Sequence, residues 1–513
     1  MVIKLLSNAA YLRGTIDGRL FSSFLEHMGR VIYTGIYEPG HPTADDQGFR
    51  GDVLQAVRQM GVTAVRYPGG NFVSNYHWQD GVGPAAQRPR RVELAWRSVE
   101  TNAFGLNEFM RWAAKAGAQP ILTVNLGTQG IENALELLEY CNHDQGTFFS
   151  DLRRSHGIAQ PYRVQTWCLG NEMDGHWQIG HKTAQEYARL AAETGRAMKR
   201  LDPDIQLVAC GSSKSDMASH PAWDLEVLEQ VYGIADYLAL HQYYGGQEMG
   251  TASFLAQSLD MEAYFDTIRA AITVMRKKTR SQAPMYISLD EWGVWSKAEH
   301  SIGRAFERTP WNIAPVIDEQ AYTMEDTLLF ASMLLAVLKH ADIVKIACQA
   351  LLTNISACIM TTPDGGIWLQ PIYYVFMMVA RHAQGQVLHT VDVAMPHYAC
   401  DAFDRVPVLD HVQTLREDGV EAVCFAVNRS QTETLTLQWQ LEHLHPVKIE
   451  EFTVLSAPDK NMTNRSHPEA IRPCAGQGAR LAGDTCQADV PPLSFCMLRV
   501  SLHNGGGQSD ASV

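Results

Sequence analysis

The segment VQTWCLGNE at residues 164–172 is a short apolar run that ends in polar side chains. The segment PMYISLDEWG at residues 284–293 repeats this arrangement and ends in acidic and aromatic residues. Short apolar runs rich in β-branched residues are typical of strands in a parallel sheet. Polar and aromatic residues at the carboxyl ends of such strands are typical of the active-site face of a (β/α)₈ barrel.

Eight such runs alternate with longer amphipathic stretches, as expected for repeated βα units. Residues 183–201, between two of the runs, have apolar residues at helical spacing and are soon followed by Pro203. A doubly wound open sheet shares this rhythm, but the polar strand ends favour an α/β fold of the (β/α)₈, or TIM barrel, type. The eight runs cover residues 20–28, 64–70, 118–127, 164–172, 205–212, 237–245, 284–293 and 343–350.

The pattern changes after about residue 384. Alternating runs such as EAVCFAVN (421–428) and SFCMLRVSL (494–502) are separated by turn-rich segments, which predicts a C-terminal antiparallel β-sandwich, jelly-roll-like in form. A chain of 513 residues is also long enough for two domains. We therefore expect an N-terminal strand that joins the sandwich (1–15), a catalytic barrel (16–383), the sandwich (384–502) and a disordered polar tail (503–513).

Composition excludes several classes of function. The 42 Lys and Arg residues against 56 Asp and Glu residues give a net charge of −14, and no segment concentrates cations with aromatics, so we expect no nucleic-acid partner. No apolar run approaches about 18 residues, so no membrane span is expected. The first seven residues lack the long apolar core of a signal peptide.

The ten cysteines are scattered and show no spacing typical of a metal site. Cys168, Cys210 and Cys348 lie within apolar runs, where a small buried thiol is the expected role. This usage predicts a reducing compartment, and therefore a cytoplasmic protein.

Two glutamates stand out as a candidate catalytic pair. Glu172 follows the fourth run and Glu291 follows the seventh, and these strands would lie on opposite sides of the barrel mouth. Glycosidases use two carboxyls about 5 to 5.5 Å apart when they retain anomeric configuration, and about 6.5 to 9.5 Å apart when they invert it. A structural salt bridge at the barrel rim is the alternative for each glutamate taken alone.

The chain resembles glycoside hydrolase family 51, the intracellular α-L-arabinofuranosidases. The resemblance extends from the first to the seventh predicted barrel strand. It rests on the segments FLEHMGRVIYTGIYEPGHP (24–42), VRYPGGNFVSNYHWQDGVGP (65–84), LAWRSVETNAFGLNEFM (94–110), LGNEMDGHWQIGHKTAQEYARL (169–190), LALHQYYG (238–245) and LDEWGVW (289–295).

By this resemblance, Glu172 is the general acid/base and Glu291 the nucleophile of a retaining exo-glycosidase that releases terminal α-L-arabinofuranosyl groups from oligosaccharides. The resemblance also implies a homohexamer, and it implies no cofactor and no metal. A nucleophile has to be ionised and an acid has to be neutral, so we expect Arg66 to favour the charged form of Glu291. The resemblance places Arg66 beneath Glu291 and His241 beside it, and it assigns the sugar to Glu26, Asn71, Trp96, Asn171, Tyr243 and Trp295.

Each supporting residue has a structural interpretation as well. Arg66 and Glu26 could pair with each other inside the barrel, and His241 could be a hydrogen-bonded core histidine. Trp96 and Trp295 could be packing residues. For the whole chain, a hydrolase of another glycoside, such as a β-D-galactofuranoside or a β-glucan, and a sugar-binding pseudoenzyme remain alternatives.

Two departures from the family pattern bear on selectivity. Leu351 occupies the position of a substrate-contacting Gln, and the nearby Gln349 lies two residues earlier in the chain. The insertion-like stretch at 296–315 is a second departure, one that could reshape the rim of the pocket.

Overall fold

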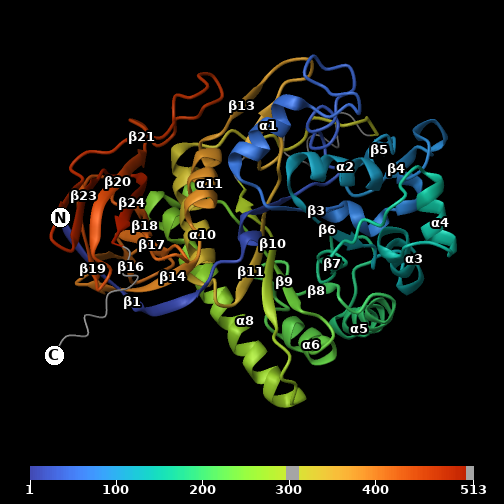
Figure 1. Ribbon diagram of the computed structural model, residues 1–513, viewed down its shortest axis with the longest axis horizontal. Coiled ribbons are helices and arrows are strands. Elements are labelled where there is room, and N and C mark those ends of the chain that lie inside the picture. The colour runs from blue at the N-terminus through green and yellow to red at the C-terminus, as the bar shows by residue number, and fades with distance from the viewer. Residues whose placement is uncertain (296–310, 504–513) are drawn as a thin grey trace, which may run out of the picture.

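The protein combines a barrel with a sheet domain, which lie side by side with two helices between them (Figure 1). The structure is a computed structural model that describes residues 1–295 and 311–503. The predicted tail at 503–513, apart from His503, and most of the insertion-like stretch at 296–315 lie outside the described residues.

Eight parallel strands form the closed barrel in the order β10-β11-β2-β3-β6-β7-β8-β9. Each predicted run overlaps one of these strands, so the predicted barrel is confirmed. The strands are β2 (Ser22–Phe24), β3 (Ala64–Tyr67), β6 (Gln119–Val124), β7 (Thr166–Leu169), β8 (Gln206–Cys210), β9 (Tyr237–Tyr244), β10 (Tyr286–Val294) and β11 (Val344–Gln349).

Helices on the outside of the barrel follow most strands. Helix α5 begins after Thr183, whose hydroxyl accepts the backbone N–H of Glu186 while the Glu186 carboxylate accepts that of Thr183. This reciprocal capping fixes the helix start as the sequence predicts. The helices are α1 (Gly51–Met60), α2 (Leu106–Ala116), α3 (Ile131–Asn142), α4 (Phe148–Ser155), α5 (Ala184–Leu201), α6 (Ala222–Val231), α7 (Thr251–Ala256), α8 (Ser258–Thr279), α10 (Met324–Lys339) and α11 (Pro371–His382). The described part of the chain also contains five 3₁₀ turns, which are η1 (Gly18–Phe21), η2 (Asn71–Asn75), η3 (Trp78–Gly81), η4 (Ala85–Gln87) and η5 (Gln247–Met249).

The second domain is one ten-stranded sheet rather than two separate sheets. It bends over so that β20 contacts β22 and β23, and this encloses a core that includes Leu437 and Trp439. The sheet is mostly antiparallel, as predicted, but β1 pairs in parallel with β19. Its strands, in spatial order, are β21 (Cys474–Ala475), β20 (Pro446–Leu455), β24 (Ser494–Leu502), β18 (Glu421–Asn428), β17 (Leu409–Leu415), β14 (Gln386–Val393), β1 (Val2–Thr15), β19 (Leu435–Glu442), β23 (Thr485–Val490) and β22 (Arg480–Ala482).

Three short hairpins complete the described elements. They are β4 (Arg91–Glu93) with β5 (Ser98–Glu100), β12 (Ile359–Thr361) with β13 (Ile367–Leu369), and β15 (His397–Tyr398) with β16 (Val406–Pro407).

Helix α10 joins the two domains. It packs against β10 and β11 of the barrel and against β17, β18 and β24 of the sheet, which explains why its sequence is apolar all round. At its end, Lys339 Nζ lies 2.5 Å from Asp410 Oδ1, and Arg429 lies 2.7 Å from Asp410 Oδ2. This buried ion cluster connects the barrel to the sheet domain.

None of the cysteines forms a disulfide, and Cys168, Cys210 and Cys348 are buried, as expected. Within the described residues we find no helix whose length and hydrophobicity would let it cross a bilayer.

Candidate active site

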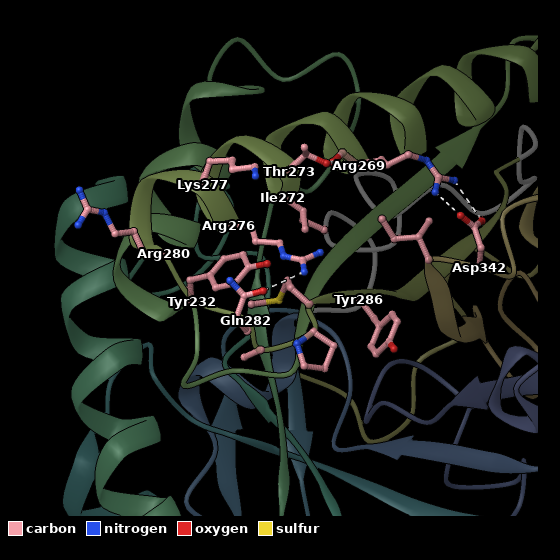
Figure 2. Close-up of a pocket in the computed structure, with 14 residues that line it drawn as sticks. Tyr232, Arg269, Ile272, Thr273, Arg276, Lys277, Arg280, Gln282, Tyr286 and Asp342 are labelled. Atoms are coloured by element: carbon pink, nitrogen blue, oxygen red, sulfur yellow. Dashed lines mark hydrogen bonds and ion pairs between the residues drawn. The ribbon is translucent and has the colours of Figure 1, made fainter.

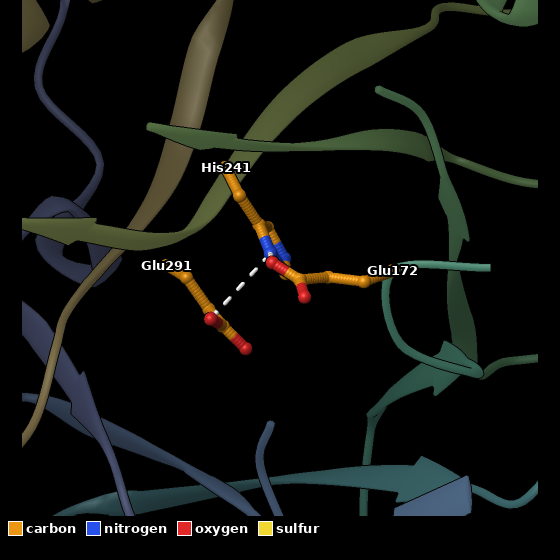
Figure 3. A group of neighbouring side chains, drawn as sticks. All are labelled: Glu172, His241 and Glu291. Carbon is orange, nitrogen blue, oxygen red and sulfur yellow. Dashed lines mark hydrogen bonds and ion pairs between the residues drawn. The ribbon is translucent and has the colours of Figure 1, made fainter. Parts of the chain in front are cut away.

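Glu172, His241 and Glu291 meet where the barrel strands end (Figure 3). Glu172 follows β7, Glu291 lies in β10, and His241 comes from β9, the neighbour of β10. His241 Nδ1 lies 2.9 Å from Glu172 Oε1 and 3.5 Å from Glu291 Oε2. One oxygen of each carboxylate and one histidine nitrogen all lie within 4.8 Å of one another.

The separation of the two carboxylates has a chemical consequence. An oxygen of Glu172 and one of Glu291 are no more than 4.8 Å apart. An inverting glycosidase needs about 6.5 to 9.5 Å to place a water between its carboxyls, whereas a retaining one holds them about 5 to 5.5 Å apart. The observed spacing therefore fits direct attack by one carboxylate on the substrate.

Arg66, from β3, lies behind the pair. Its guanidinium is 2.9 Å from Glu291 Oε1, 3.4 Å from Asp290 Oδ2, and donates to Asn171 Oδ1 at 2.6 Å. Burial lowers the pKa of Arg66, but the carboxylates of Asp290 and Glu291 raise it well above its usual value. Arg66 is thus a fixed positive charge beneath Glu291, and it does not pair with Glu26, the alternative that the sequence left open.

Asp290 was missed by sequence reasoning. Its Oδ1 lies 3.0 Å from His241 Nε2, so this carboxylate orients the ring that faces Glu172. In a regular strand, neighbours point to opposite faces, yet Asp290 and Glu291 both lie inside the barrel, 2% and 4% exposed. The pairing of β10 with β9 shifts register between Ser288 and Glu291, and this bulge brings both side chains inward.

The pKa shifts of the two glutamates run opposite to the expected ones. Burial raises the pKa of Glu291, and the charge of Glu172 adds to this, so the pKa lies above its usual value despite His241 and Arg66. Burial also raises the pKa of Glu172, but the hydrogen bond and charge of His241 lower it below its usual value. The reason is distance, since His241 is closer to Glu172. We expected the reverse order, with Glu172 the more protonated of the two.

The same three side chains are the only group of three or more potential metal ligands within the described residues. Burial lowers the pKa of His241, but Glu291 and Asp290 raise it well above its usual value. The contacts of His241 Nδ1 with both glutamates allow the ring to move a proton to or from either carboxylate.

A cavity of about 540 Å³ opens above the pair. Seven of the predicted site residues line it, and Arg66, Asn171 and His241 lie behind its wall. The lining residues are Phe24, Glu26, Met28, Gly70, Asn71, Trp96, Glu172, Trp177, Lys214, Tyr243, Tyr244, Gly245, Glu291, Trp295 and Leu351.

Glu26 and Trp96 form one side of the cavity. Glu26 Oε1 accepts the Trp96 indole N–H at 2.7 Å and the Phe72 backbone N–H at 3.0 Å. Gly70 has φ +63°, and a Cβ there would lie 1.9 Å from Glu26 Oε2. Only glycine therefore allows the turn before Asn71 to pass this close to the carboxylate.

Tyr243 and Trp295 form another side. The Tyr243 hydroxyl donates to Glu291 Oε2 at 2.9 Å, and its ring meets that of Trp295 edge to face at 5.3 Å. Asn171, by contrast, is held by Arg66 and has only a long 3.4 Å contact from its amide nitrogen to Gln178.

Leu351 lines the cavity and is 2% exposed. Gln349 does not line it, because its amide nitrogen donates to the carbonyls of Ala350 and Ser356, the latter at 2.8 Å. Gln349 therefore does not reach the cavity, and Leu351 presents an apolar surface there.

Two further lining residues, Trp177 and Lys214, were not predicted. The Trp177 indole N–H donates to Glu172 Oε2 at 2.5 Å, and the Lys214 ammonium lies 5.8 Å from the centre of the Trp177 ring. Trp177 lies five residues after Glu172 in a quoted motif, so its aromatic side chain beside a catalytic candidate was a usable signal. Lys214 carried no comparable signal.

A larger hollow, of about 790 Å³, lies at the other end of the barrel (Figure 2). It is lined by the end of α8 and by the residues that precede β10 and β11. Its one carboxylate, Asp342, is paired with Arg269, and Figure 2 shows the Arg280 side chain directed away from the others. This hollow lacks a pair of acid and base groups, so the smaller cavity is the better candidate site.

Comparison with known proteins identifies the family. Residues 56–260 match the family model described as the α-L-arabinofuranosidase 1 domain, and residues 290–494 match the α-L-arabinofuranosidase C-terminal domain. The chain is 46% identical to an intracellular exo-α-(1→5)-L-arabinofuranosidase of Halalkalibacterium halodurans over 95% of this chain and 96% of that protein. It is 44% identical to one from Bacillus subtilis, over 97% and 98% of the two chains.

Solved structures give the same result. A family 51 α-L-arabinofuranosidase from Bifidobacterium longum superposes with a TM-score of 0.92 at 38% identity, covering 97% of this chain and 99% of that one. An arabinose complex of α-L-arabinofuranosidase from Thermotoga maritima has a TM-score of 0.86 at 32% identity, covering 98% and 100%.

Proposed function

The chain belongs to the α-L-arabinofuranosidases of glycoside hydrolase family 51, and we propose that Glu172 and Glu291 are its acid/base and its nucleophile. The enzyme is a retaining exo-glycosidase that hydrolyses terminal, non-reducing α-L-arabinofuranosyl residues of arabinose-containing oligosaccharides. The observation that supports the two roles most strongly is the spacing of no more than 4.8 Å between their carboxylate oxygens.

The reaction proceeds in two displacements. Glu291 attacks the anomeric carbon while Glu172 gives its proton to the departing glycosidic oxygen, which leaves a covalent glycosyl-enzyme. Glu172 then removes a proton from water, and this water breaks the ester bond to Glu291. Two inversions at the same carbon retain the configuration.

The first step needs the proton on Glu172 and the charge on Glu291. The pKa shifts run the other way, downward for Glu172 and upward for Glu291, so Glu172 has to gain a proton before the first step. His241 Nδ1 faces both carboxylates, at 2.9 Å and 3.5 Å. It can therefore give its proton to Glu172, while Arg66, 2.9 Å from Glu291 Oε1, favours the charged form of the nucleophile.

The remaining residues hold the furanose ring. Glu26, Asn71 and Tyr243 present polar groups to the hydroxyls, whereas Trp96 and Trp295 offer aromatic faces and edges to the C–H surfaces. Arg66 stabilises the charged nucleophile and holds Asn171 in position next to the acid/base.

Several relatives are named intracellular, and all ten cysteines of this chain are unpaired. Both observations support action inside the cell, in the cytoplasm. The homohexamer that the family resemblance implies stays a prediction.

The test is a panel of nitrophenyl glycosides, comprising the α-L-arabinofuranoside, β-D-galactofuranoside, β-D-xyloside and β-D-glucoside. We expect the highest kcat/KM for the arabinofuranoside and a first product of retained configuration by NMR. Hydrolysis that is fastest on another member of the panel would reject the substrate, and a first product of inverted configuration would reject the mechanism.

A further inference from the structure

Lys214 brings an isolated positive charge to the cavity. Among the described residues that line it, only Lys214 is cationic, whereas Glu26, Glu172 and Glu291 are acidic. Its ammonium lies 5.8 Å from the centre of the Trp177 ring. Within the described part of the chain it has no carboxylate within 4.0 Å and donates no hydrogen bond.

The backbone around Lys214 is nevertheless held firmly. On one side, the Ser213 backbone N–H donates to Asp174 Oδ2 at 3.0 Å, and its hydroxyl donates to the same carboxylate. On the other side, the Ser215 backbone N–H donates to Gln242 Oε1 at 2.9 Å. The loop after β8 is thus tied to the loop after β7 and to β9, so the ammonium is presented from a fixed base.

The position of Lys214 corresponds to the leaving-group side of the site. Glu172 delivers its proton to the departing oxygen. The Trp177 indole N–H donates to Glu172 Oε2 at 2.5 Å, and the Lys214 ammonium lies 5.8 Å from the centre of the same Trp177 ring. A group attached to the departing oxygen therefore comes near Lys214, whereas the furanose itself is held by Glu26, Asn71 and Tyr243.

A positive charge near a general acid makes proton retention harder, because it stabilises the ionised form of the carboxyl group. Burial raises the pKa of Glu172 and the hydrogen bond from His241 lowers it, and the charge of Lys214 lowers it further. An anion bound to Lys214 would offset this charge and so favour the protonated form of Glu172, which the first step requires. A neutral leaving group has no such effect.

We propose that Lys214 selects leaving groups that carry a carboxylate, such as an oligosaccharide with a uronic acid next to the scissile bond. This inference rests on the proposed function, because it uses the leaving-group side of that reaction. It adds an anionic class of substrate to the terminal arabinofuranosyl group.

The test compares two aryl α-L-arabinofuranosides, one with a 4-carboxyphenyl and one with a 4-carbamoylphenyl leaving group. These differ in charge but hardly in shape. Their leaving-group abilities differ as well, but equally for every variant, so a change in the ratio of their kcat/KM values between variants reports recognition of the carboxylate. We expect Lys214→Met to lower this ratio about two- to fivefold, the effect of one partly exposed ion pair. Lys214→Glu should lower it further, and Lys214→Arg should keep it.

A matched control is Lys277→Met, which removes the same charge from the hollow at the far end of the barrel and should leave the ratio unchanged. High salt should reduce the wild-type ratio but not that of Lys214→Met. Equal ratios for the wild type, Lys214→Met and Lys214→Glu would overturn the role of Lys214 while leaving the proposed function intact. If the wild type hydrolyses neither substrate, the proposed function fails, and this inference fails with it.

Discussion

His241 Nε2 lies 3.0 Å from Asp290 Oδ1, while Nδ1 of the same ring lies 2.9 Å from Glu172 Oε1. The ring thus connects a carboxylate that does not line the cavity to the one that acts on the substrate. Burial lowers the pKa of His241, and Glu291 and Asp290 raise it well above its usual value. Asp290 therefore influences the protonation of Glu172 through the His241 ring, although no direct contact joins these two described carboxylates.

This relationship predicts the effect of Asp290→Asn. Without the Asp290 charge, the pKa of His241 should fall, because one of the groups that stabilise the imidazolium is gone. We expect activity to drop about tenfold or more, since the ring no longer holds its proton and orientation. NMR titration of the His241 ring, assigned with His241→Gln, measures the pKa, and an unchanged value would contradict the prediction.

Glu291→Ala should abolish formation of the glycosyl-enzyme, because no other carboxylate in the described site is placed to attack the anomeric carbon. Steady-state rates on nitrophenyl α-L-arabinofuranoside measure this. More than a few per cent of the wild-type rate would exclude Glu291 as nucleophile. The thermal unfolding midpoint of the variant serves as the control, since a misfolded protein is also inactive.

Glu172→Ala should slow hydrolysis of substrates with poor leaving groups far more than of those with good ones, because only poor leaving groups need the proton. Azide should restore turnover of an activated aryl substrate by attacking the intermediate from the vacated side. An azide product of the opposite anomeric configuration to the substrate would be incompatible with a retaining mechanism.

Leu351→Gln should change selectivity rather than remove catalysis. Leu351 lines the cavity, and a glutamine there can bond a sugar hydroxyl that leucine cannot. We expect the preference for arabinofuranoside over β-D-galactofuranoside to rise by about 1 to 1.5 kcal/mol, a typical neutral hydrogen bond. If a folded variant has the wild-type ratio of kcat/KM values, this position does not contact the sugar.

Asp410→Asn should weaken the junction between barrel and sheet. Burial raises the pKa of Asp410, but Arg429 and Lys339 lower it to about 2. A free aspartate titrates near 3.9, so this ionisation stabilises the fold above about pH 4 and its contribution is lost as the pH falls towards 2. We expect the free energy of unfolding at pH 7, measured by urea denaturation, to fall by about 3 kcal/mol in this variant.

The difference in free energy of unfolding between the wild type and Asp410→Asn should narrow at pH 3. At this pH the aspartate of the unfolded chain is largely protonated, so ionisation of Asp410 in the folded protein contributes less. Asp418→Asn, which alters an exposed pair with Arg416, should have little effect at either pH. If the free energies of unfolding of the wild type and Asp410→Asn differed by the same amount at pH 7 and pH 3, the ionisation of Asp410 would not stabilise this junction.

The barrel could be predicted because its strands are short apolar runs with a distinct polar end, a pattern that does not depend on distant residues. Glu172 and Glu291 could be selected for the same reason, as each follows such a run. Asp290 could not, since only the bulge in β10 turns it inward beside Glu291. The parallel pairing of β1 with β19 likewise depends on how distant segments meet.

Electrostatic properties were harder to predict than positions. The sequence places Arg66 near Glu291 but contains no distances, and the protonation of the pair depends on His241 being 2.9 Å from one carboxylate and 3.5 Å from the other. Lys214 was missed for a similar reason. It lies in a loop without a periodic pattern, and hydrogen bonds of its neighbours to Asp174 and Gln242 decide where it points.

The pairing of β1 with β14 has a consequence for biosynthesis. Thr15 and Gln386 are hydrogen-bonded across the sheet although 371 positions separate them, and the whole barrel lies between them in the chain. At roughly 5 to 20 residues per second, a ribosome needs about 20 to 70 seconds to travel from one to the other. During this interval β1 has no partner, while the barrel sequence is being completed. The order of translation therefore favours folding of the barrel first. The sheet forms afterwards, when β14, from the chain after the barrel, pairs with β1, from the chain before it.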